Sequence, residues 1–174
     1  GTGDLAIEFA SAVGASGRVI GTDFVPEMLE LARKKAPSMK FEVADVTALP
    51  YADDSFDIAS ISFGIRNVGD PRKGIAELAR VVRPGGRVVV VEFGTPRPGL
   101  FRALYNLYRR TLLPLLGGAV TGDRAAYRYL ETSTAKFPSD DAFVAMMNES
   151  ANFVSIDYRP LTLGIAYVYR GIVA

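Results

Sequence analysis

Apolar positions recur along the chain with two periods, one typical of strands and one typical of helices. Short apolar runs predict strands over 18–23, 39–43, 57–63 and 88–91. Apolar residues spaced by three and four positions predict helices over 5–13 and 26–36 and a third helix that begins at Asp70. Strands and helices therefore alternate through the first half of the chain, which favours parallel strands joined by helices.

Two local signals support this pattern. Asp70 followed by Pro71 is the typical start of a helix, with the acid as N-cap and the proline at the first helical position. A Pro84-Gly85-Gly86 turn ends that helix, and the β-branched run over 88–91 follows it. A continuous apolar run of this kind is typical of a parallel strand covered on both faces.

The second half of the chain has a different character. Aromatic and basic residues dominate 100–135, and we interpret this segment as a helical lid inserted into the domain. An amphipathic helical cap that serves only the core is the structural alternative. A further amphipathic helix is predicted over 139–151, followed by strands over 153–159 and 161–173. Because only Pro160 would join these two strands, we expect them to be antiparallel. No repeat or linker divides the chain, so one domain is expected over 1–174.

The predicted order of elements indicates an α/β fold, with a doubly wound, mostly parallel sheet and an antiparallel hairpin at the C-terminus. Ligands of such folds bind at the carboxyl ends of the strands. The chain opens on Gly1-Thr2-Gly3, a glycine turn that normally follows a strand. We therefore expect the first strand of the sheet to be missing from these residues.

Composition removes several classes of site. The 174 residues include no cysteine and no histidine, so thiol nucleophiles, histidine-ligated metals and Ser-His-Asp triads are excluded. No metal is expected. A net charge of +1 gives no field that favours nucleic acid as a partner. No apolar run approaches the roughly 20 residues that cross a bilayer, and a cytoplasmic setting is expected.

The first candidate site is the glycine turn itself. Gly1 to Ala6 fits G-x-G-x-x-[GA], and Asp23 lies 20 residues beyond Gly3, where a ribose-binding acid belongs. Such a turn brings the backbone close to a nucleoside ligand, and the carboxylate accepts hydrogen bonds from the ribose hydroxyls. This arrangement suits NAD and S-adenosylmethionine equally. A helix-capping turn with an incidental acid is the structural alternative.

The next strand is followed by Asp45 and Val46, which we interpret as adenine contacts. The carboxylate can accept from the adenine amino group while the backbone N–H of Val46 donates to the ring. The alternative is that Asp45 only forms a turn. The chain has no Tyr-x-x-x-Lys pair and no histidine, and their absence weakens the nicotinamide interpretation.

Several motifs together resemble the UbiE/COQ5 family of quinone-biosynthesis C-methyltransferases. The motifs are Gly1-Thr-Gly-Asp4, Asp45 to Pro50, Ser62-Phe-Gly-Ile-Arg-Asn67, Arg83-Pro-Gly-Gly86, Glu92-Phe93 and Tyr127-Arg-Tyr-Leu130. The motifs at 62–67 and 127–130 are the narrowest of them. The resemblance implies a class I fold that uses S-adenosylmethionine. By matching motif it implies a cofactor pocket lined by Thr2, Asp23, Asp45, Val46 and Ser62, with Gly1 and Gly3 close to the methionine moiety.

The resemblance also implies an acceptor, a polyprenyl quinol, with demethylmenaquinol favoured over the ubiquinone precursor. Methylation of a ring carbon requires electron density there, which rises when a neighbouring hydroxyl ionises. We expect Arg66 to stabilise the resulting phenolate and Asn67 to orient the hydroxyl. A structural salt bridge is the alternative for Arg66. The family more often places histidine where Tyr169 stands, so no role is assigned to Tyr169.

Other functions remain open from the residues alone. They are a methyltransferase acting on another small aromatic molecule, a nicotinamide-dependent oxidoreductase and a nucleoside-binding module without catalysis. Because the expected acceptor is a lipid, we hypothesise peripheral contact with the inner face of the membrane through Arg102, Arg109 and Arg110. A homodimer is a further hypothesis.

Overall fold

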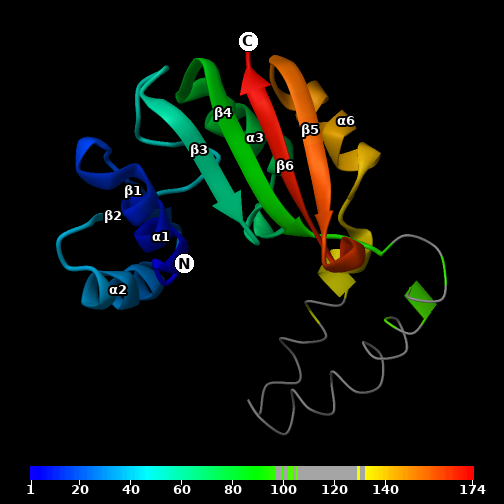
Figure 1. Ribbon diagram of the computed structural model, residues 1–174, viewed down its shortest axis with the longest axis horizontal. Helices are drawn as coiled ribbons and strands as arrows, with labels where there is room; N and C mark the ends of the chain where they lie inside the picture. Colours follow the sequence, from blue (N-terminus) through cyan, green and yellow to red (C-terminus); the bar gives the residue numbers. More distant parts are fainter. Residues whose placement is uncertain (97–98, 100–101, 104, 106–128, 130–131) are drawn as a thin grey trace, which may run out of the picture. The chain divides into compact units, whose positions relative to one another are not determined.

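The computed structural model describes residues 1–96, 99, 102–103, 105, 129 and 132–174 (Figure 1). The chain divides into two compact units, Gly1–Pro50 and Tyr51–Ala174, and each is described by itself. The expectation of one domain over 1–174 stays a prediction. Most of the expected lid over 100–135 lies outside the described residues, and those described between 102 and 135 are helical.

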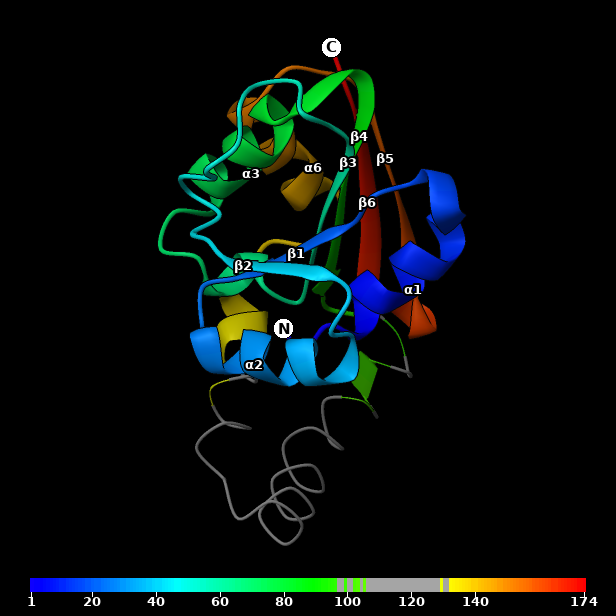
Figure 2. The ribbon, with the colours of Figure 1, turned by 90° about the vertical axis from the view of Figure 1, so that its left-hand side faces the viewer.

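The first unit is a strand-helix-strand arrangement preceded by a helix. Its elements are α1 (Asp4–Val13), a 3-10 turn η1 (Gly14–Ser16), β1 (Ile20–Asp23), α2 (Pro26–Lys35) and β2 (Lys40–Val43). The two strands pair in parallel and lie side by side in Figure 2. Leu29 and Ala32 of α2 are buried against Phe41 of β2 and form the core of this unit.

The second unit contains a four-stranded sheet. Its elements are β3 (Phe56–Ser62), η2 (Ile65–Asn67), α3 (Pro71–Arg80), β4 (Val82–Phe93), α6 (Asp141–Ser150), β5 (Phe153–Leu161), η3 (Thr162–Gly164) and β6 (Ala166–Val173). The strand order is β3-β4-β6-β5, with β3 and β4 parallel and β6 antiparallel to both of its neighbours. The expected mostly parallel α/β fold with a C-terminal antiparallel hairpin is therefore confirmed.

Helices α3 and α6 lie on one face of this sheet in both views (Figures 1 and 2). Asp70 caps α3 as predicted, because its carboxylate accepts a hydrogen bond from the backbone N–H of Lys73 at 3.1 Å. On β4, Val88 and Val90 are fully buried, whereas Val89 and Val91 between them are partly exposed. The valine run thus has alternating burial rather than the uniform burial that the sequence predicted.

Two predicted boundaries are wrong. Pro160 does not join the last two strands: it lies within β5 opposite Tyr167, and the chain turns at η3. Proline can lie there because β5 is the edge strand of the described sheet, where a ladder donor is not required on the outer side. Strand β4 also begins before the Pro84-Gly85-Gly86 turn, which the ladder with β3 accommodates by a register shift between Phe56 and Ile58.

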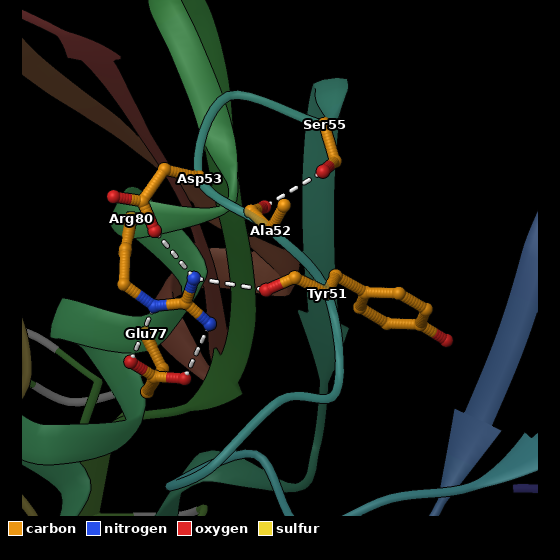
Figure 3. A network of polar contacts seen from close by, with 6 residues as sticks. All are labelled: Tyr51, Ala52, Asp53, Ser55, Glu77 and Arg80. Atoms are coloured by element: carbon orange, nitrogen blue, oxygen red, sulfur yellow. Dashed lines mark hydrogen bonds and ion pairs between the residues drawn. The ribbon is translucent and has the colours of Figure 1, made fainter.

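The chain enters β3 through a loop that one arginine fixes (Figure 3). Arg80, at the end of α3, donates to the backbone carbonyl of Tyr51 at 2.9 Å and pairs with Asp53 at 2.6 Å. Its other nitrogens contact both carboxylate oxygens of Glu77. The hydrogen bonds that Arg80 donates to Glu77 and then to Asp53 raise the pKa of Arg80. The loop before β3 is thereby tied to the helix that follows β3 in the chain.

Candidate active site

Asp23 is the last residue of β1, and its carboxylate binds two nitrogens. One oxygen accepts from the backbone nitrogen of Gly1, and the other accepts from the backbone N–H of Val25 at 2.8 Å. The side chain is 25% exposed. The structure thus places the predicted ribose acid beside the glycine turn, as the sequence spacing required.

Gly3 is required in this turn for conformation and for space. Its φ of +87° lies in the left-handed region that favours glycine. A Cβ atom at this position would lie 2.8 Å from Cβ of Ala32 and 3.2 Å from the ring of Phe41. The missing side chain therefore allows α1 to begin against α2 and β2, a packing reason that the motif alone did not reveal.

Thr2 lies in a small polar cluster at the start of α1. Its hydroxyl donates to Asp4 at 2.7 Å and accepts from Lys35 at 3.2 Å, and Lys35 also pairs with Asp4. The hydrogen bonds from Lys35 and then Thr2 lower the pKa of Asp4. The structure gives Thr2 these protein partners, and its role toward the cofactor stays a prediction.

Asp45 and Val46 follow β2 at the edge where Asp23 ends β1. The two strand ends are adjacent, since the N–H of Ala44 donates to the carbonyl of Asp23 at 3.1 Å. One oxygen of Asp45 accepts from both the backbone N–H and the hydroxyl of Thr47, at 2.8 and 2.9 Å. The turn-forming alternative for Asp45 is thus present.

In the second unit, Ser62 ends β3 and the chain reverses immediately. Phe63 has a φ of +54°, which is uncommon for a bulky residue. Its N–H still donates to the carbonyl of Val91 at 2.8 Å, so the ladder with β4 continues through the reversal. The turn directs the chain into η2, which carries Arg66 and Asn67 and begins with the fully buried Ile65. Backbone strain of this kind is frequent at functional sites.

Arg66 forms a buried ion pair with Glu92 of β4. Its Nη1 atom donates to Oε1 of Glu92 at 2.6 Å, and the two side chains are 8% and 1% exposed. The same Nη1 donates to the carbonyl of Phe63 at 3.0 Å, and Cζ lies 5.2 Å from the ring centroid of Phe93. The salt bridge that was the structural alternative for Arg66 therefore exists. It uses Nη1 and does not involve Nε or Nη2.

Asn67 contacts a distant part of the chain. Its side-chain oxygen accepts from the hydroxyl of Tyr129 at 3.1 Å, and both residues are exposed. With its oxygen used in this way, the amide of Asn67 can offer hydrogen-bond donors to a neighbouring acceptor. This contact connects the two narrowest motifs, at 62–67 and 127–130.

The predicted residues thus form two groups. Gly1, Thr2, Gly3, Asp23, Asp45 and Val46 belong to the first unit, and Ser62, Arg66 and Asn67 belong to the second. Sequence reasoning assigned no role to Glu92, Phe93 or Tyr129, which surround Arg66 and Asn67. Glu92 had two visible signals, since it belongs to the Glu92-Phe93 motif and is a lone acid that continues the buried face of Val88 and Val90.

The chemistry of the first group fits a nucleoside. Carboxylates at two adjacent strand ends can accept from ribose hydroxyls and from an exocyclic amine. Carboxylates also suit a ligand with a positive sulfonium centre. The second group offers a charged guanidinium, an amide and aromatic rings, which suit an aromatic acceptor that develops negative charge.

Comparison with known proteins agrees with this chemistry. The ubiE/COQ5 methyltransferase family matches residues 1–173. The Ubiquinone/menaquinone biosynthesis C-methyltransferase UbiE of Bdellovibrio bacteriovorus is 55% identical over 99% of this chain and 75% of its own length. The demethylmenaquinone methyltransferase of Thermus thermophilus is 46% identical over 98% of this chain and 78% of its own length.

Solved structures support the same fold. A SAM-dependent methyltransferase from Methanosarcina mazei matches with a TM-score of 0.65 and 23% identity, over 98% of this chain and 87% of its own. Phosphoethanolamine N-methyltransferase 2 of Haemonchus contortus, in complex with S-adenosyl-L-methionine, matches with a TM-score of 0.69 and 13% identity, over 99% and 46%. The fold is that of class I methyltransferases. The family match overturns the nicotinamide-dependent alternative. The chain belongs to the ubiE/COQ5 methyltransferase family and is an S-adenosylmethionine-dependent methyltransferase.

Proposed function

We propose that the chain transfers a methyl group from S-adenosylmethionine to a ring carbon of a polyprenyl quinol, with demethylmenaquinol as the preferred acceptor. The names of the relatives support a quinone precursor. Those of Thermus thermophilus and Deinococcus radiodurans are both named demethylmenaquinone methyltransferase, and they are 46% and 44% identical to this chain. The ubiquinone precursor is the second acceptor to test.

In this proposal the first unit holds the cofactor, which supplies an electrophilic methyl group when bound. Asp23 binds the ribose, Asp45 and the N–H of Val46 bind adenine, and the turn over Gly1 to Gly3 approaches the methionine moiety. A carbonyl near Ser62 receives the ammonium group. Support comes from the adjacency of the ends of β1 and β2, where Asp23 and Asp45 lie.

The second unit acts on the acceptor. Arg66 stabilises the negative charge of the ionised quinol hydroxyl, and Asn67 donates to the same oxygen and orients the ring. Methyl transfer depends on alignment and exclusion of water more than on a strong base. The single observation that carries this assignment is the guanidinium of Arg66, which is buried and fixed by protein contacts, and whose Nε has no hydrogen-bond partner among the described residues.

Calorimetric titration with S-adenosylhomocysteine and, separately, NADH tests the cofactor. Transfer of an isotopically labelled methyl group to a short-tailed demethylmenaquinol, with the product analysed by mass spectrometry, tests the acceptor. Binding of the homocysteine analogue together with ring methylation is expected. Binding without ring methylation would leave the cofactor assignment intact and overturn the quinol acceptor.

Arg66→Ala tests the residue assignment within this function. Removing one preorganised donor to a developing oxyanion lowers kcat by roughly 100- to 1,000-fold. We expect a loss of that size with unchanged affinity for S-adenosylhomocysteine. Full turnover by Arg66→Ala would restrict Arg66 to a structural role.

Peripheral membrane contact follows from the lipid acceptor and forms part of the proposal. None of the described helices is both long and apolar enough to cross a bilayer. Arg102 is exposed, whereas Arg109 and Arg110 lie outside the described residues. Co-flotation with vesicles that contain anionic lipid is expected, and its absence would overturn the hypothesis of peripheral membrane contact. The homodimer and the cytoplasmic setting stay predictions.

A further inference from the structure

Glu92 is a carboxylate in an apolar setting. It is 1% exposed, and none of the other described charged residues is more deeply buried. It shares a face of β4 with Val88 and Val90, which are both fully buried. Burying a charge is costly unless that charge is paired and hydrogen-bonded. The buried carboxylate of Glu92 therefore needs partners that compensate its charge.

The carboxylate contacts Arg66 at two points. Oε1 accepts from Nη1 of Arg66 at 2.6 Å and also from the backbone N–H of Phe93 at 2.8 Å. Oε2 lies 3.4 Å from the backbone nitrogen of Arg66, which donates to it. The Glu92 carboxylate thus fixes both the backbone and the guanidinium of Arg66. The backbone N–H of Phe93 in turn fixes the carboxylate.

These contacts use one side of the guanidinium. Nη1 is saturated by Glu92 and by the carbonyl of Phe63, and Cζ lies over the ring of Phe93, 5.2 Å from its centroid. Nε of Arg66 is buried and has no hydrogen-bond partner among the described residues. A buried donor without a partner is rare in proteins and requires an explanation such as a ligand or an ordered water.

We propose that Glu92 is a positioning residue for methyl transfer: it holds the Arg66 guanidinium by Nη1 so that the Nε–H is presented to the acceptor oxygen, directly or through one water. This role rests on the proposed function, in which Arg66 stabilises the phenolate. Glu92 itself does not touch the acceptor. Its contribution to turnover therefore passes entirely through Arg66.

A structural role for Glu92 has a different consequence. If the carboxylate only closes the turn between β3 and η2, its loss damages the fold whether or not Arg66 is present. If it acts through Arg66, its loss has no effect on turnover once the guanidinium is gone. A double-mutant cycle separates these cases, because coupled residues give non-additive effects.

The cycle uses Glu92→Gln, Arg66→Gln and the double variant, each in the full protein. Glu92→Gln can keep its oxygen toward Nη1 and the N–H of Phe93, while it removes the charge and the acceptor for the backbone N–H of Arg66. We expect kcat on the short-tailed quinol to fall roughly 10- to 100-fold, the range for losing a charge-assisted hydrogen bond. KM for S-adenosylmethionine and the affinity for S-adenosylhomocysteine should stay unchanged. The double variant should be no slower than Arg66→Gln.

Asp57→Asn is the matched control. Asp57 of β3 pairs with Arg83 of β4 at 2.7 Å, which is also an arginine–carboxylate ion pair that ends on β4. The side chains of Asp57 and Arg83 are 78% and 57% exposed, and Asp57 lies near the start of β3, whereas Arg66 follows the end of this strand. This variant should keep wild-type kcat and KM.

Chemical rescue keeps the test informative if a variant folds poorly. Guanidinium ion added to Arg66→Ala should restore part of kcat, because Glu92 can bind the free cation in the vacated space. The same ion should not restore kcat in Arg66→Ala/Glu92→Gln. Homocysteine-analogue binding and thermal unfolding report whether each variant is folded.

Three results would overturn the role of Glu92. They are losses that multiply in the double variant, unchanged kcat in Glu92→Gln beside a strongly impaired Arg66→Gln, and equal guanidinium rescue with and without Glu92. Full turnover in Arg66→Gln would overturn this role while leaving the quinol acceptor intact. Failure of the wild-type protein to methylate any quinol would overturn the proposed acceptor, and the role of Glu92 with it.

Discussion

Tyr129 donates its hydroxyl hydrogen to the side-chain oxygen of Asn67 at 3.1 Å, and the two residues are 62 positions apart in the chain. The contact brings a residue of the predicted lid segment to the turn that follows β3. It also fixes which end of the Asn67 amide can face a ligand. Tyr129 is 56% exposed, so its ring contributes little to the core.

Tyr129→Phe should therefore affect turnover more than stability. The substitution keeps the ring and removes the hydroxyl, which leaves the Asn67 amide free to rotate. A neutral hydrogen bond contributes about 0.5–1.5 kcal/mol, so kcat should fall roughly 2- to 10-fold. Steady-state kinetics with the quinol and thermal unfolding measure the two effects. A large drop in the unfolding temperature with normal kcat would contradict this prediction.

Asp23→Asn should weaken cofactor binding. The amide oxygen can still accept from the N–H of Val25, so the turn after β1 is kept. The lost charge removes the stronger hydrogen bonds to ribose hydroxyls, which contribute about 1.5–3 kcal/mol. Calorimetry should show S-adenosylhomocysteine binding roughly 10- to 100-fold more weakly. Asp157→Asn, at an exposed carboxylate that pairs with Arg170, is the control and should bind normally.

Asp70→Ala should lower stability without changing turnover. The carboxylate caps α3 through the N–H of Lys73, and loss of such a cap costs about 1 kcal/mol. The midpoint of thermal unfolding should fall by about 2–4 °C. Asp70→Ser keeps a capping oxygen and should recover most of the loss. An unchanged midpoint in the alanine variant would show that the cap contributes nothing.

Tyr169 should make stability fall at alkaline pH. Burial raises the pKa of its phenol, which is 1% exposed and accepts a hydrogen bond from the N–H of Asp140 at 2.8 Å. Above the ordinary tyrosine pKa of about 10, the unfolded chain loses this proton while the folded chain keeps it, so stability falls as pH rises.

Tyr169→Phe removes the contribution of this phenol to the pH dependence of stability. The variant should be less stable at neutral pH, because the N–H of Asp140 loses its partner, at a cost of about 1–3 kcal/mol. Its deficit relative to the wild type should shrink as pH rises above about 10. Denaturant unfolding at pH 7 and at several alkaline pH values measures the difference. A deficit that is constant across this range would contradict the assignment.

Local sequence signals predicted most of the elements correctly. The N-cap at Asp70 with Pro71 depends on contacts within one turn, so the helix start could be read from adjacent residues. The carboxylates that end β1 and follow β2 were also predictable, because a spacing of about 20 residues places them at one edge of parallel strands. The C-terminal strands followed from alternation, although the turn between them did not.

The wrong boundaries have physical causes that lie beyond local sequence. Proline normally ends a strand. Pro160 lies in the edge strand β5, where its missing N–H does not remove a hydrogen bond to a neighbouring strand. The glycines after Pro84 normally break a strand, but β4 absorbs the irregularity in a register shift against β3. In both cases the place of the strand in the sheet decides, and a single sequence does not show that place.

By itself the sequence determined the α/β class, the order of elements, the family and the residues at strand ends. Tertiary structure alone decided that Glu92 holds Arg66, that Tyr129 holds Asn67 and that Gly3 makes room for Ala32. The physical reason is range: propensities and caps act within a few residues, whereas these contacts join residues 26, 62 and 29 positions apart through strand register and close packing.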